Sequence, residues 1–132
     1  MQAVQRKPVF GQDFPSFMNY LRAGDTGLDL SPSRYADLLE MDSQTLAENA
    51  GVHRNTIAHA PGSAKLQQFL RESVRALSAA TDLHGNVEDA LFWCVTIPLQ
   101  PFGYETASAL VSEGRTDAVL AYLASLNFGF AG

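Results

Sequence analysis

Apolar residues along this chain recur mainly at spacings of three and four positions, the repeat of an amphipathic helix. The clearest stripe consists of Leu66, Phe69, Leu70, Val74 and Leu77. Strict alternation of apolar and polar residues, which is typical of a half-buried strand, is nearly absent. The pattern therefore predicts an all-α fold.

Gly, Pro and Asn residues divide the chain into short predicted helices. We expect helices at residues 14–21, 32–41, 43–50, 54–59, about fifteen residues from residue 65, 87–95, 106–113 and 117–126. The expected N-caps are Ser31, Asp42 or Ser43, and Thr116. Gly51 and Gly114 are expected to end helices in the left-handed conformation.

The sequence Ala60-Pro61-Gly62-Ser63 breaks the helical pattern, because proline disfavours helical geometry at the residue before it. We take this point as the boundary between two modules. The predicted organisation is an N-terminal helix and linker (1–30), a first helical module (31–62) and a second helical module (63–132).

The composition is that of an ordinary globular protein, with 132 residues, of which 46% are apolar and 17% charged. It excludes collagen-like, disulfide-stapled and largely disordered chains. The single cysteine, Cys94, lies in an apolar helix and is interpreted as a small buried hydrophobe. No export signal or membrane helix of roughly 18 apolar residues is found, so we expect a reducing, cytoplasmic location.

Motifs of catalysis are missing from the sequence. There is no phosphate-binding loop, no nucleophile elbow, no zinc-protease motif and no carboxylate pair in an apolar setting. His53 and His59 are six positions apart, so they do not share a helical face as metal ligands would. We expect neither an enzyme nor a bound metal or cofactor.

Charge changes sign along the chain. The net charge is −5, which argues against general nucleic-acid coating, yet residues 51–75 carry a net charge of +3. Residues 1–24 are also basic, with a net charge of +2, whereas residues 25–50 and 76–132 each carry −5. The basic segment at 51–75 is compatible with a local phosphate contact or with a solvated helix face.

Residues 44–59 have the spacing of a helix-turn-helix. Ala47 is small where two helices would cross, Gly51 turns the chain, Val52 packs in the corner and Ile57 anchors the second helix. In this register the outward positions are His53, Arg54, Asn55, Ala58 and His59.

The polar residues among these outward positions could meet base edges or phosphates, and Gln44 could contact the DNA backbone. Acidic residues flank the motif: Asp37, Glu40, Asp42 and Glu48. The alternative is therefore a scaffold that no longer binds DNA. The predicted DNA-contacting residues are Gln44, His53, Arg54, Asn55 and His59.

The last six residues, Asn127 to Gly132, place Phe128 and Phe130 where a chain is normally polar. Either the two rings fold back onto the protein's own helices, or they insert into a partner's pocket. Gly129 and Gly132 would allow a close backbone approach in the second case.

Several segments of the second module form a recognisable set. They are Ala90–Trp93, Ile97–Leu99, Phe102–Leu110, Glu113–Arg115, Val119–Leu123 and Gly129–Gly132. Together with the helix-turn-helix spacing, residues 31–132 resemble the Xre-like antitoxins of RES-domain toxin systems, which carry the toxin-binding domain shared with the MbcA and ParS antitoxins. The chain departs from them at Thr106-Ala107, where Thr-Pro is frequent, and residues 1–30 match nothing assignable.

The resemblance implies an antitoxin that forms a homodimer and represses its own operator DNA through the helix-turn-helix. Its partner would be a NAD-consuming RES-domain toxin, whose active-site cleft is occluded by the antitoxin's C-terminal end. The implied inserting residues are Asn127, Phe128, Gly129, Phe130, Ala131 and Gly132. Glu113 and Arg115, on a turn expected beside them, would add polar contacts.

Two other functions remain open. The chain could be a stand-alone helix-turn-helix transcription regulator whose second module dimerises or senses a ligand. It could also be an adaptor whose helix-turn-helix is only structural, which the acidic flank would explain.

Overall fold

Eight α-helices and one 3-10 helix make up the computed structural model, which describes residues 8–22 and 29–131; these ranges contain no β-strand, only an isolated bridge between Leu99 and Glu105. The prediction of an all-α fold is confirmed. The elements are α1 (Phe14–Arg22), α2 (Pro32–Leu39), α3 (Ser43–Ala50), α4 (Arg54–His59), α5 (Ala64–His84), α6 (Val87–Thr96), η1 (Gln100–Phe102), α7 (Ala107–Ser112) and α8 (Thr116–Ala131).

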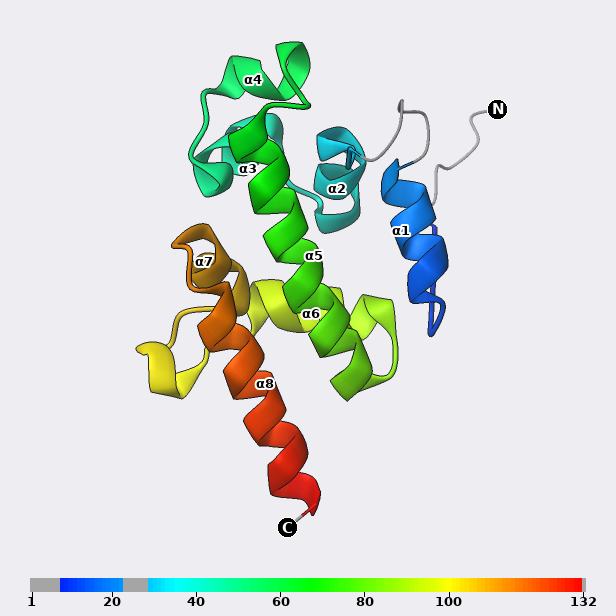
Figure 1. Cartoon of the computed structure of the whole chain (residues 1–132), viewed down its shortest axis with the longest axis vertical. Helices are drawn as coiled ribbons and strands as arrows, with labels where there is room; N and C mark the ends of the chain where they lie inside the picture. The colour runs from blue at the N-terminus through cyan, green and yellow to red at the C-terminus, as the bar shows by residue number, and fades with distance from the viewer. Residues whose placement is uncertain (1–7, 23–28, 132) are drawn as a thin grey trace, which may run out of the picture.

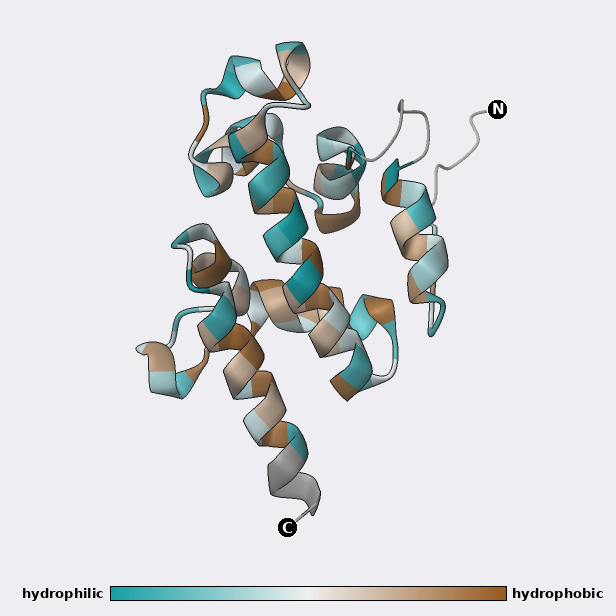
Figure 2. Cartoon of the chain, in the orientation of Figure 1, coloured by the Kyte–Doolittle hydropathy of each residue, from teal (hydrophilic) through white to brown (hydrophobic). Residues whose placement is uncertain are grey.

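The long helix α5 runs through the centre of the molecule (Figure 1), and α2, α3, α6, α7 and α8 all pack against it. The predicted apolar stripe is its inner face, because Leu66, Leu70 and Leu77 are at most 2% exposed. α5 is longer than predicted because Ala79 and Ala80 prolong the helix up to Gly85, whose φ of 90° ends it. Figure 2 shows α6 and α8 as mainly hydrophobic, whereas hydrophobic and hydrophilic residues alternate along α5.

The N-terminal helix belongs to the core. Phe17 and Leu21 of α1 are fully buried in the same hydrophobic cluster as residues of α2, α3 and α5 to α8. The Glu88 carboxylate accepts the backbone N–H groups of Phe10 (2.8 Å) and Gly11 (2.9 Å), which ties the start of the described chain to α6. Most of the predicted linker before α2 lies outside the described residues.

Local signals set most helix ends as expected. Ser31 caps α2 by accepting the Arg34 N–H, Asp42 caps α3 by accepting the Thr45 N–H, and Gly51 ends α3 with φ 71°. The prediction that Thr116 caps the last helix is wrong. Thr116 is the first residue of α8, and its buried hydroxyl has no hydrogen-bond partner, whereas the Arg115 carbonyl accepts the first helical N–H bonds.

None of the helices in the described part of the chain is both long and apolar enough to cross a membrane.

Candidate interaction surfaces

The turn between α3 and α4 brings two short helices into contact. Ala47 is 1% exposed at this contact. The left-handed Gly51 lets the Val52 N–H donate to the Ala47 carbonyl at 3.0 Å, which redirects the chain into α4. Ile57 is only half-buried, and α4 contains no fully buried residue. α4 is therefore a shallowly anchored helix with most of its surface free.

The outward residues predicted for this second helix are all exposed, namely His53, Arg54, Asn55, Ala58 and His59. One of them also has a structural role, since Nδ1 of His53 accepts the Asn55 N–H at 3.1 Å and so caps α4. Gln44 lies on α3, and its amide donates to the Glu48 carboxylate at 3.0 Å. Gln44 is exposed, but it is paired with an acidic neighbour.

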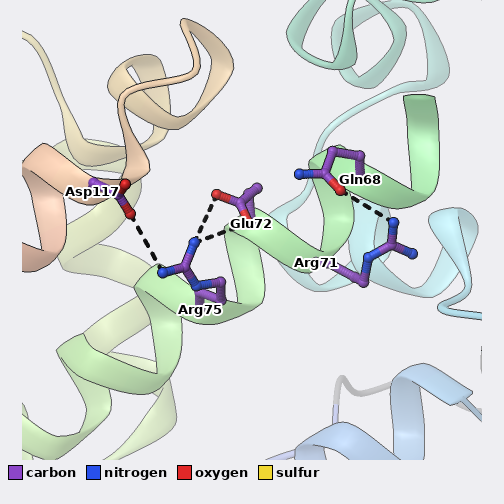
Figure 3. A network of polar contacts seen from close by, with 5 residues as sticks. All are labelled: Gln68, Arg71, Glu72, Arg75 and Asp117. Carbon is purple, nitrogen blue, oxygen red and sulfur yellow. Dashed lines mark hydrogen bonds and ion pairs between the residues drawn. The ribbon is translucent and has the colours of Figure 1, made fainter. Parts of the chain in front are cut away.

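The basic face of α5 is partly neutralised within the molecule (Figure 3). Nη1 of Arg75 contacts the Glu72 carboxylate at 3.0 Å, and its Nη2 contacts the Asp117 carboxylate of α8 at 3.4 Å. Arg71 donates to the Gln68 amide oxygen at 3.2 Å. Among the cations of residues 51–75, Arg54, Lys65 and Arg71 form no ion pair, so a polyanion could reach them.

A second polar surface lies where the η1 loop meets the turn between α7 and α8. The Arg115 guanidinium stacks over the Phe102 ring at 5.3 Å, and Phe102 meets Tyr122 of α8 edge to face at 5.8 Å. The pKa of Glu105 is raised, first because its protonated carboxyl can donate a hydrogen bond to Glu113, and then by desolvation and by the like charge of Glu113. The positive charge of Arg115 acts in the opposite direction. We call these residues, Phe102, Glu105, Glu113, Arg115 and Tyr122, the Arg115 cluster.

Tyr104 stands beside this cluster in an unusual backbone conformation. Its φ is 67°, rare for a residue with a side chain, and its ring is 65% exposed. Its N–H donates to the carbonyl of the buried Leu99 at 3.0 Å, which holds the loop in place. Sequence reasoning did not single out Tyr104, because no sequence signal marks a left-handed tyrosine.

The end of α8 lies away from the Arg115 cluster. The chain was expected to leave the helix after Leu126, but α8 continues to Ala131, because no proline interrupts it and Gly129 alone weakens a helix by only about 1 kcal/mol. Phe128 follows Thr116 by twelve helical positions, or roughly 18 Å along the axis. The expectation that Glu113 and Arg115 lie beside the chain end is therefore wrong.

Among the α8 side chains that the structure describes, which end at Asn127, Leu126 is the last half-buried one and Asn127 is exposed. Figure 1 shows the last turns of α8 extending beyond the other helices. The side chains of residues 128–131, and Gly132 as a whole, lie outside the described part of the structure.

Cys94 is confirmed as a buried hydrophobe. It is 4% exposed, and burial raises the pKa of its thiol to about 12. It lines a cavity of about 20 Å³, room for a single water molecule, together with Tyr35, whose pKa burial also raises to about 12.

Comparisons with protein-family models, with curated proteins and with solved structures find no match for this chain. Inferences about its function therefore start from the outward face of α4, the Arg115 cluster and the projecting end of α8.

Proposed function

We propose that the chain is an antitoxin that binds a NAD-consuming RES-domain toxin with its C-terminal half. The segments that resemble the MbcA, ParS and Xre toxin-binding domain correspond to α6, η1, α7 and α8, which surround α5. The observation that carries the proposal is the end of α8. It remains helical to Ala131, beyond Leu123, which is the last buried residue among the α8 side chains that the structure describes, and it extends past the other helices (Figure 1).

The antitoxin would inhibit the toxin by occupying its active-site cleft and so excluding the substrate. A helical end that is already formed loses less conformational entropy on entering a cleft than a disordered tail does. Glu113 and Arg115 precede α8 and are therefore at least roughly 18 Å from Phe128 along its axis, so they would contact the toxin outside the cleft. The net charge of −5 over residues 76–132 would favour a cleft lined by basic residues.

The test is co-expression of the chain with the product of the neighbouring gene, with cell survival and NAD content as readouts. The full chain should restore both, and a chain without residues 127–132 should restore neither. The shortened chain should lose only the circular dichroism of the helical residues removed from α8 and should keep the melting temperature of the full chain. Full rescue by the shortened chain would refute the idea that the end of α8 blocks the toxin.

A second proposal concerns residues 31–62, which we infer to be a helix-turn-helix that contacts operator DNA through α4. The observation in its favour is the exposed row of polar side chains on α4, with Arg54 as an unpaired cation. A homodimer would place two such helices on the two half-sites of an operator.

Substituting Arg54, Asn55 and His59 by alanine should weaken binding to the upstream DNA of the operon and leave toxin binding unchanged. His53 is unsuitable for this test, because its ring also caps α4. Operator binding with no toxin to neutralise would favour a stand-alone regulator. Absence of operator binding even at low salt, where phosphate contacts are strongest, would favour the adaptor.

A further inference from the structure

An apolar groove of about 280 Å³ runs between the first described residues, the end of α2 and the outer face of α6. Its lining residues are Pro8, Val9, Leu38, Leu39, Glu40, Glu88, Leu91, Phe92 and Val95. Three of the apolar ones are unusually exposed, with values of 79% for Val9, 63% for Phe92 and 36% for Val95. Exposed apolar side chains gathered in one groove mark a binding surface.

One wall of the groove is held firmly in place. Both oxygens of Glu88 accept backbone N–H groups, from Phe10 and Gly11, and the Val87 N–H donates to the Gly11 carbonyl at 2.7 Å. Pro8 and Val9 are therefore held against α6. Residue 7 is bonded directly to Pro8, so the chain leaves the described structure from the wall of the groove itself.

We propose that residues 1–7, Met-Gln-Ala-Val-Gln-Arg-Lys, occupy this groove. They combine apolar side chains, such as Val4, with the cations Arg6 and Lys7, and the groove combines an apolar lining with the carboxylates of Glu40 and Glu88. Seven extended residues span up to roughly 23 Å, whereas Leu91 to Val95 span only about 6 Å of helix. The segment therefore reaches the whole groove.

Two other occupants fit less well. A second copy of the chain would bring two sets of Glu40 and Glu88 together between molecules of net charge −5. A drug-sized ligand usually takes a pocket of roughly 300–1,000 Å³, and this groove, at about 280 Å³, is at the lower end of that range. Residues 1–7 are also covalently attached beside the groove, so their binding is intramolecular and their effective concentration is higher than that of a free ligand. A partner that uses the groove would have to displace residues 1–7.

The test is paramagnetic relaxation in the full chain with a spin label at Gln2→Cys. Cys94 is buried and can stay in place, because the label reacts with the accessible thiol. The amide signals of Leu91, Phe92 and Val95 should lose most of their intensity. A label at Ser125→Cys, an exposed position on α8, serves as the control and should leave these three signals intact.

Reversing the charges, with Arg6→Glu and Lys7→Glu in the labelled chain, should restore the groove signals, and so should Phe92→Ala, which leaves the core untouched. Intact groove signals in the labelled parent chain, with the rest of the spectrum unchanged, would overturn the proposal. Loss of signal that occurs only between labelled and unlabelled copies would also overturn it, in favour of a second copy.

Discussion

Gln67 shows how a single buried amide can organise this fold. It is 3% exposed, its Oε1 accepts the Leu30 N–H at 2.9 Å, and its Nε2 donates to the carbonyls of Leu30 and Pro61, both at 2.8 Å. It thereby joins the segment before α2 and the turn after α4 to α5. Sequence patterns do not reveal this role, because a glutamine on an amphipathic helix normally indicates the solvent face.

We expect Gln67→Leu to lower the free energy of unfolding by roughly 2–3 kcal/mol, because it removes the partner of two buried backbone groups of Leu30 and of the part-buried Pro61 carbonyl. Urea unfolding followed by circular dichroism measures this. The neighbouring Gln68→Leu, at an exposed position, is the control and should change stability by less than about 0.5 kcal/mol. Equal effects of the two substitutions would show that the amide of Gln67 does not hold the turns.

Asp42 should make stability depend on pH in acid. Hydrogen bonds from the backbone and side chain of Thr45 lower the pKa of its carboxyl below 3.8 in the folded protein. The cap therefore stabilises the fold above the unfolded pKa, and this contribution is lost as the pH falls through the folded pKa.

Between neutral pH and about pH 3, the melting temperature of the wild type should fall further than that of Asp42→Asn. The reason is that asparagine keeps a capping oxygen that does not titrate. Thermal unfolding across this range is the measurement. Two curves that stay parallel would contradict the role of the Asp42 cap.

At the scale of helices, sequence predicts the starts better than the ends. Ser31 and Asp42 predict the starts of α2 and α3 correctly, because a single side chain that accepts a backbone N–H is enough to form an N-cap. α5 extends past the fifteen residues predicted for it, as far as the expected turn at His84-Gly85-Asn86, and α8 extends past Leu126, since the residues that prolong the two helices carry no clear stop signal. Thr116 was misread for a related reason: whether a threonine caps a helix or is buried in its first turn depends on tertiary packing, which the sequence does not display.

Gly51 should be the most sensitive position of the turn between α3 and α4. Its φ of 71° disfavours a residue with a Cβ, and a Cβ there would also lie 3.3 Å from Cε of Lys65. We expect Gly51→Ala to destabilise the protein by about 1–2 kcal/mol, and Gly51→Asn to cost less, because asparagine tolerates this conformation. Thermal unfolding compares them, and an alanine variant as stable as the glycine parent would be contrary evidence.

At the scale of the whole molecule, adjacency in sequence misleads where a long helix intervenes. The exposed face of α4 was predicted correctly, because its residues lie within one short helix. Glu113 and Arg115 were correctly placed near each other, but their partners Phe102 and Glu105 come from a separate loop. The prediction that the chain end lies beside Glu113 and Arg115 was wrong, since these two residues precede the start of α8 and the chain end follows its other end.

The same architecture predicts one cooperative unit rather than two independent modules. Leu46 and Leu110 lie on opposite sides of the predicted boundary at residue 62, yet both are 0% exposed in one cluster, and α3 packs against both α5 and α7. Replacing either by alanine should cost about 2–5 kcal/mol. Each replacement should also shift the same unfolding transition, because the two side chains stabilise the same core.

Fluorescence of the single Trp93 on α6 reports on the second module alone, while circular dichroism reports on all helices. With one cooperative core, Leu46→Ala lowers the Trp93 midpoint as much as the circular dichroism midpoint. With independent modules, the same substitution would leave the Trp93 midpoint where it is in the wild type and would produce a second, earlier transition in circular dichroism. With independent modules, deleting one of them would be a sound way to test the proposed DNA binding and the proposed toxin binding separately. With one core, only surface substitutions can do so.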